Sequence, residues 1–147
     1  MKYSRIIFVC QDNTTLSPMA EAIFRDMVKS PDVEVLSRGL VVLFPEPLNE
    51  FAREALLSHQ MDFSKETTSP FVLDEVNDET LILTMTISQS IKIAQEYGLT
   101  EQVFTLRKFD KEEEGDIKDP FGGGLLEYQT LYQELSELIR KLIANLE

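Results

Sequence analysis

The sequence is poor in cysteine, histidine and basic residues, and these scarcities limit the kinds of site and partner that it can have. Its single cysteine, Cys10, cannot form an internal disulfide or a cysteine-rich metal cluster. Its single histidine, His59, lies far from Cys10 along the chain, and we interpret it as a surface residue. Lysine and arginine number 14 against 26 aspartate and glutamate, a formal net charge of -12. Nucleic acids and anionic membranes are bound through basic side chains, so we expect neither as a partner.

Long apolar runs are also missing. The first run, residues 6–10, reaches polar Gln11 after five residues and is too short for a signal peptide or a membrane span. We therefore expect a cytoplasmic protein, where a lone thiol stays reduced. A length of 147 residues with 43% hydrophobic content predicts one globular domain over residues 1–147.

What the sequence does contain is an alternation of apolar runs and helical patterns. Strands are predicted at residues 6–9, 33–36, 81–85 and 103–106, and helices at 18–28, 49–58, 88–97 and 125–146. The acidic run 110–116 is predicted to be a solvated loop. The alternation predicts a three-layer α/β fold, a four-stranded parallel sheet with helices on both faces. Ligands of such sheets bind beyond the carboxyl ends of the strands, where Cys10 lies.

Cys10 is placed where a thiol can act as a nucleophile. A polar turn follows it, and then Ser17 is predicted as the N-cap and Pro18 as the first residue of a helix. Loop amides and a helix N-terminus favour a thiolate, so we expect a lowered Cys10 pKa and a hydrogen bond from Ser17 to the sulfur. The alternative is that Cys10 is an ordinary buried cysteine at a strand end.

Asp119 is the candidate acid for the leaving group of such a nucleophile. It precedes Pro120 and, after Phe121, the three glycines 122–124. This setting gives a carboxyl group held in a turn beside a flexible segment. The alternative is that Asp119 serves only the turn, since Asp-Pro commonly opens one.

Residues 10–21 read CQDNTTLSPMAE. This segment resembles the phosphate-binding loop of the low-molecular-weight protein tyrosine phosphatases, in which a Cys is followed by five residues and Arg-Ser, usually with Pro-Met-Ala-Glu next. The resemblance covers the whole chain and includes DPFGG at residues 119–123. Within the family, the chain resembles the bacterial protein arginine phosphatases in particular, at Thr14, at FTL (residues 104–106) and at DPFGG.

The resemblance implies a cysteine-dependent phosphatase that hydrolyses phosphotyrosine or phosphoarginine through a phosphocysteine. Cys10 would attack phosphorus, Asp119 would protonate the leaving atom, and Ser17 would stabilise the thiolate. The substrate would be a phosphorylated protein or a small phosphate-bearing molecule, with no cofactor and no metal. The implied phosphate- and substrate-binding residues are Gln11, Asp12, Asn13, Thr14, Thr15, Leu16 and Phe121. Of these, Asn13 would brace the loop, and the Thr14 hydroxyl would orient a polar substrate and the attacking water.

Leu16 and Asp12 both depart from the family pattern. The loop arginine falls on Leu16, which has neither charge nor donors for the phosphoryl group. We therefore expect strongly reduced activity and a Cys10 pKa above that of active relatives. Asp12 falls where the family has glycine, and its carboxylate would repel a dianion if it points inward. The alternative is a catalytically silent pseudophosphatase that binds phosphate or phosphoproteins as a regulatory domain.

Two other classes fit less well. A phosphocysteine carrier of the sugar-transport IIB kind also has a Cys after its first strand, but the late Asp-Pro and the Ser-Pro-Met-Ala-Glu segment disfavour it. An arsenate reductase on this fold needs further cysteines. Arg38, Arg107 and Lys108 follow predicted strands and could in principle replace the missing cation, but we predict each to be a solvated surface residue.

Overall fold

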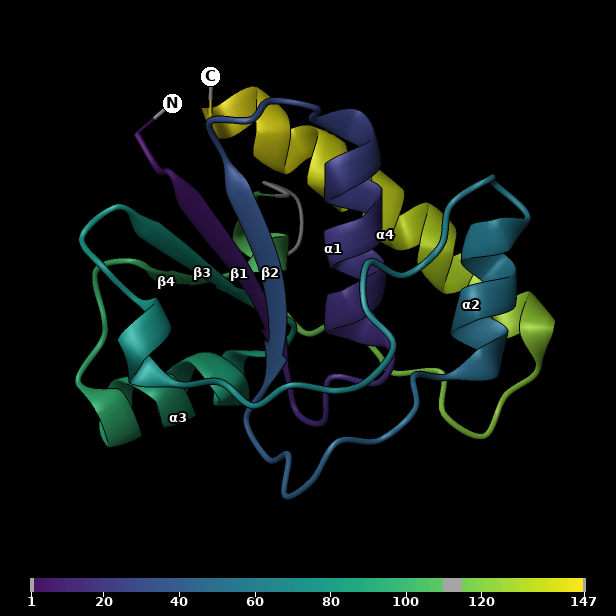
Figure 1. Cartoon of the computed structure of the whole chain (residues 1–147), viewed down its shortest axis with the longest axis horizontal. Helices are drawn as coiled ribbons and strands as arrows, with labels where there is room; N and C mark the ends of the chain where they lie inside the picture. The colour runs from purple at the N-terminus through teal and green to yellow at the C-terminus, as the bar shows by residue number, and fades with distance from the viewer. Residues whose placement is uncertain (1, 110–114, 147) are drawn as a thin grey trace.

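The computed structural model describes residues 2–109 and 115–146. Its strands are β1 (Arg5–Cys10), β2 (Glu34–Gly39), β3 (Thr80–Thr84) and β4 (Val103–Thr105). They form a parallel sheet in the order β2-β1-β3-β4 (Figure 1). The helices are α1 (Leu16–Met27), α2 (Glu50–Leu57), α3 (Ile87–Tyr97) and α4 (Leu125–Leu146), with short 3₁₀ turns η1 (Leu73–Glu75) and η2 (Leu106–Phe109).

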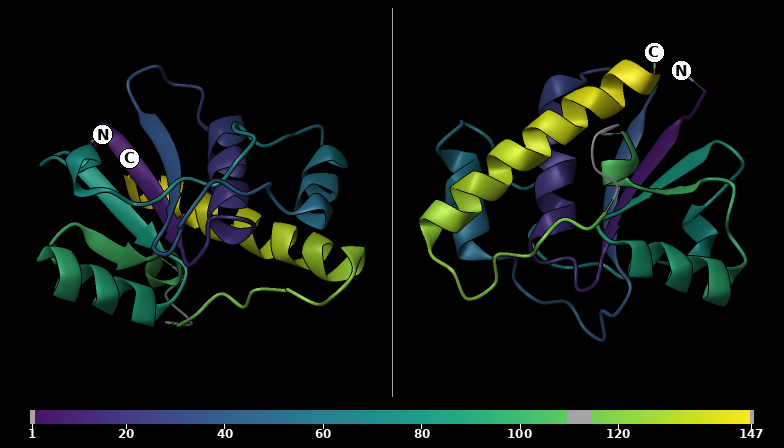
Figure 2. Two further views of the ribbon diagram at one scale, coloured as in Figure 1. Left: turned by 60° about the horizontal axis from the view of Figure 1, so that its bottom comes forward. Right: turned by 180° about the vertical axis from the view of Figure 1, so that it is seen from behind.

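Helices cover both faces of the sheet, which confirms the predicted fold class. In Figure 1, α1, α2 and α4 lie on one side and α3 on the other. Figure 2 shows α4 lying across α1 and α2. The apolar face of α4 is buried over its length, as its three- and four-residue spacing predicts.

The central strand β1 explains why its run lacks alternation. Ile6, Phe8 and Cys10 face the core formed with α1, α2 and α4, while Ile7 and Val9 face the core formed with α3. All five side chains are at most 3% exposed, since helices cover both faces. Because side chains alternate along a strand, the Cys10 side chain lies on the same face as Ile6 and Phe8, toward α1.

Element boundaries differ from the prediction mainly at β2. We predicted a strand ending at Leu36, yet β2 continues to Gly39, because residues 34–39 pair in parallel register with residues 5–10. This extension aligns Gly39 with Cys10 at the same end of the sheet. The predicted acidic loop 110–116 lies mostly outside the described residues.

Candidate active site

Cys10 is the last residue of β1 and is 3% exposed. Its Sγ lies 2.9 Å from the Ser17 Oγ, the contact expected from the sequence. Burial raises the pKa of the thiol, and hydrogen bonds from Ser17 and the backbone only partly offset this effect. The predicted lowering of the pKa is therefore wrong, because loss of solvent around the sulfur outweighs the amides of the loop.

The start of α1 corrects a second expectation. The helix begins at Leu16, so Thr15 is its N-cap, and no side chain caps the first turn. Ser17 lies inside the helix, and its hydroxyl makes a hydrogen bond with the sulfur instead. The N-terminal amides of α1 are therefore not capped by the Ser17 side chain.

Asn13 holds the loop from within. It is fully buried and has a φ of 62°, in the left-handed region that asparagine tolerates better than most residues. Its Nδ2 donates to Ser17 Oγ at 2.8 Å, and its Oδ1 accepts from the Ser69 N–H at 2.9 Å and from Lys65 Nζ. The geometry agrees with a bracing role for Asn13.

Gly39 allows the loop to lie against the end of β2. A Cβ built there would lie 2.9 Å from the Asp12 carbonyl carbon and 2.7 Å from Val42 Cγ2. Any larger residue would push the loop away from the sheet. The end of β2 is therefore part of the site.

Asp12 bonds to the loop itself. Its Oδ1 accepts from the Thr14 N–H at 3.1 Å and from the Thr14 hydroxyl at 2.9 Å. Its negative charge contributes to raising the pKa of Cys10 and that of Asp119. The Asp12 carboxylate thus occupies the Thr14 amide, and its charge acts on both Cys10 and Asp119.

Replacing Asp12 should strengthen anion binding. Asp12→Gly removes a charge and frees the Thr14 amide, and a hydrogen bond to a charged group is worth roughly 1.5–3 kcal/mol. We expect the affinity for inorganic phosphate, measured by titration calorimetry, to rise about tenfold or more. Asp12→Asn, which keeps the acceptor without the charge, should give a smaller gain. Equal phosphate affinity in all three proteins would show that Asp12 does not oppose the anion.

The remaining loop residues differ in exposure. Gln11 is exposed, and its carbonyl accepts from the Val41 N–H at 2.8 Å. Thr15 is 2% exposed and Leu16 4% exposed, with the Leu16 side chain in the core shared with α1, α2 and α4. Leu16 thus presents an apolar, buried side chain at the N-terminus of α1.

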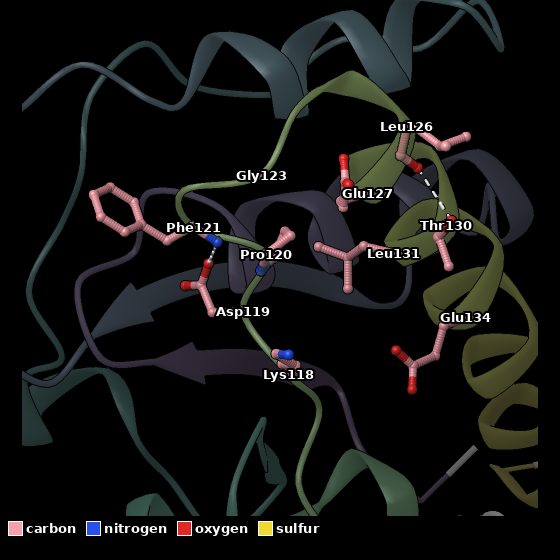
Figure 3. Close-up of a pocket in the computed structure, with 10 residues that line it drawn as sticks. All are labelled: Lys118, Asp119, Pro120, Phe121, Gly123, Leu126, Glu127, Thr130, Leu131 and Glu134. Atoms are coloured by element: carbon pink, nitrogen blue, oxygen red, sulfur yellow. Dashed lines mark hydrogen bonds between the residues drawn. The ribbon is translucent and has the colours of Figure 1, made fainter.

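Asp119 and Phe121 lie on the segment that leads into α4. Figure 3 shows both side chains on one side of this segment, with Leu131 and Glu134 of α4 on the other. The Phe121 N–H donates to Asp119 Oδ1 at 2.9 Å, and the Phe121 ring is 87% exposed. Partial burial raises the pKa of Asp119, the Phe121 N–H opposes this, and the charge of Asp12 adds to the rise. Asp119 therefore keeps its proton to a higher pH than an ordinary carboxyl group.

A cavity of about 500 Å³ lies between this segment and the first turns of α4. Its walls include Asp119, Phe121, Leu126 and Leu131 (Figure 3), and Cys10 is not among its lining residues. The cavity is adjacent to the candidate acid rather than to the thiol.

The candidate replacement cations are engaged elsewhere. Arg38 makes two hydrogen bonds to the Glu75 carboxylate, at 2.8 and 2.7 Å, and its side chain is only 16% exposed. Arg107 pairs with Glu134, and Lys108 Nζ lies over the Phe104 ring. For Arg38 and Arg107 the prediction of a solvated surface residue is wrong, because each is partly buried against a carboxylate.

His59 lies on the surface, whereas Lys65 contacts the Cys10 loop. The His59 ring is exposed and stacks on Tyr132 at 3.9 Å, which confirms a surface role. Lys65, which contacts Asn13, was not predicted. It lies in an irregular segment, which the pairing of Gly39 with Pro70 and the Ser69–Asn13 hydrogen bond bring to the loop.

Among residues 2–109 and 115–146, no group of three or more His, Cys, Asp and Glu side chains is arranged to hold a metal ion. In the same ranges, no helix has the length and apolarity needed to cross a membrane.

Known proteins match the chain over nearly its full length. The family model described as low molecular weight phosphotyrosine protein phosphatase matches residues 5–147. The protein-arginine-phosphatase of Bacillus subtilis is 34% identical over 145 residues, 97% of this chain and 96% of that protein. PtpB of Staphylococcus aureus, a low molecular weight protein-tyrosine-phosphatase, is 34% identical over 139 residues, 94% of this chain and 96% of that protein.

A solved structure agrees with these matches. A YwlE arginine phosphatase mutant with a phosphorylated active-site serine superposes with a TM-score of 0.86 and 35% identity, covering 97% of this chain and 95% of that one. Identity at this level over almost the whole chain is enough to assign a family. The chain therefore belongs to the low molecular weight phosphotyrosine protein phosphatase family.

Proposed function

We propose that this chain is a cysteine-dependent protein phosphatase that forms a phosphocysteine on Cys10, and that Leu16 strongly reduces its turnover. The observation that carries the proposal is the Cys10–Ser17 contact at the carboxyl end of β1, beside the N-terminus of α1. Family membership supports the chemistry, and the solved relative with phosphate on its active-site serine supports the covalent intermediate.

The reaction has two steps. The Cys10 thiolate attacks phosphorus, and the P–O bond of phosphotyrosine or the P–N bond of phosphoarginine breaks while Asp119 gives its proton to the leaving oxygen or nitrogen. The Asp119 carboxylate then takes a proton from water, which attacks phosphorus. The S–P bond breaks, and inorganic phosphate and the thiolate are released. The raised pKa of Asp119 suits it to begin the cycle as an acid.

The substrate is proposed to be a phosphorylated protein, with phosphotyrosine and phosphoarginine as the two residue types. The relatives named for arginine and for tyrosine dephosphorylation are equally similar, at 34% identity. Thr14 favours phosphoarginine, since its hydroxyl offers polar contact to substrate and water. That hydroxyl donates to Asp12, so it would meet the substrate as a hydrogen-bond acceptor.

A silent phosphoprotein-binding domain is the second candidate. Two observations favour it: Leu16 is apolar and buried, and burial raises the pKa of Cys10. Such a domain would bind phosphopeptides without releasing phosphate.

One experiment separates the two candidates. The chain is incubated at high concentration with phosphotyrosine and phosphoarginine peptides, and free phosphate and protein mass are followed at neutral pH, because acid would cleave the P–N bond of phosphoarginine. We expect slow release with a transient mass gain of one phosphoryl group, both abolished by Cys10→Ala, which leaves no side-chain atom to accept the phosphoryl group. Phosphopeptide binding without release or mass gain would instead identify the silent domain. Release that persists in Cys10→Ala would contradict the proposed nucleophile.

A further inference from the structure

Lys65 brings a positive charge to the buried side of the Cys10 loop. It lies in the segment between α2 and η1 and is partly buried. Its Nζ donates to Asn13 Oδ1 and to the Ser37 backbone oxygen, the latter at 2.8 Å. Both acceptors are neutral, so the ammonium charge is not cancelled by either contact.

Hydrogen bonds connect this ammonium to the sulfur. Asn13 accepts from Lys65 and donates to Ser17 Oγ at 2.8 Å, and Ser17 Oγ lies 2.9 Å from Cys10 Sγ. Because Ser17 Oγ accepts from Asn13, its own proton is free to point elsewhere. Its acceptors are the sulfur and the more distant Arg38 carbonyl at 3.4 Å. A thiolate is the stronger acceptor, so the chain of bonds favours the charged sulfur.

The carboxylates around Lys65 are bound to arginines. Glu21 on α1 accepts from Arg25 at 2.9 Å, and Glu75 is held by Arg38. Burial lowers the pKa of Lys65 to about 8, with repulsion from Arg38 acting the same way and attraction to Glu21 and Glu75 opposing it. The ammonium therefore remains the main form at neutral pH.

We propose that Lys65 is a positioning residue that stabilises the Cys10 thiolate through Asn13 and Ser17. The inference rests on the proposed function and refines it. A loop arginine performs two tasks, holding the thiolate and binding the phosphoryl oxygens. Lys65, bonded to buried Asn13 and to the backbone of β2, performs the first task and not the second. Asp12, whose charge raises the pKa of Cys10, acts against it.

Thiolate absorbance in the ultraviolet tests the inference, because Cys10 is the only cysteine and Cys10→Ser supplies the tyrosine background. Lys65, with a pKa of about 8, carries its charge only in the lower part of the titration, so the proteins are compared below a pH of about 8. There we expect Lys65→Met to lower the thiolate fraction about tenfold. Lys65→Arg should restore much of the thiolate. Lys65→Gln, which keeps a donor for Asn13 without the charge, should titrate like Lys65→Met and serves if the methionine variant fails to fold.

Lys29→Met is the matched control, since Lys29 is an exposed lysine beyond the far end of α1. It should leave the thiol titration unchanged. Unchanged titration in both Lys65→Met and Lys65→Gln would overturn the inference. The thiol titration can be measured without turnover. If the Lys65 variants change the titration but the unmodified chain releases no phosphate, only the proposed phosphatase activity is refuted. Turnover without a shift would refute only the role of Lys65.

Discussion

Leu16→Arg is expected to raise the hydrolysis of para-nitrophenyl phosphate by at least about 10² to 10³, the usual effect of one preorganised donor to a developing charge. Leu16 opens α1 at the N-terminus that faces the Cys10 loop. A guanidinium there can bond the phosphoryl oxygens in pairs and adds a positive charge in the transition state. The substitution would supply the phosphoryl contact that Lys65 cannot make.

The same substitution should lower stability. Leu16 is 4% exposed and packs in the core with α1, α2 and α4. Taking this side chain out of the core costs roughly 1.5–3 kcal/mol. The melting temperature should fall by several degrees while activity rises.

Leu16→Met is the control for this prediction, because it conserves volume and adds no charge. It should change neither turnover nor melting temperature appreciably. A family-typical rate in the unmodified chain, hardly altered by Leu16→Arg, would refute our account of Leu16.

Asp119→Asn should slow the hydrolysis of phenyl phosphate by about 10² to 10⁴, the usual contribution of a general acid. The measurement is made in the Leu16→Arg protein, where rates are high enough to compare. Phenolate leaves poorly without a proton, whereas para-nitrophenolate is a good leaving group. The loss should therefore be much smaller for para-nitrophenyl phosphate.

The pH profile gives a second readout of the same residue. The first step needs protonated Asp119, and burial and Asp12 raise its pKa. The alkaline limb due to this acid should therefore lie above the ordinary carboxyl range and move to lower pH in Asp12→Asn. Asp32→Asn, an exposed carboxylate near the start of β2, should alter neither rate nor profile. Equal losses on both leaving groups would assign Asp119 a structural role only.

Much of the fold could be predicted because apolar periodicity reports burial directly. The uniform run of β1 predicted a strand covered on both faces, and the α4 spacing predicted its long buried stripe. The carboxyl end of β1 then located Cys10. Thus the position of the candidate nucleophile and the overall layers follow from local patterns.

The errors concern properties that depend on distant residues. Ser17 suits a helix cap and a thiol partner equally well by type, and only the position of the sulfur decides between them. The Cys10 pKa depends on how completely helices cover the end of β1, which the loop sequence does not reveal. Lys65 belongs to an irregular segment without periodicity, so only the folded chain shows its contact with Asn13.

The contacts of Asn13 also bear on when the loop can form during folding. Its bonds to Lys65 and Ser69 span 52 and 56 residues of sequence, and Gly39 must already lie beside it. Contacts of such separation form only after their loops have closed. The surroundings of Cys10 should therefore assemble late, and their amides should exchange hydrogen mainly through global unfolding. A proteolytic cut between α2 and η1 would then release the Cys10 loop from a distance, without touching the loop itself.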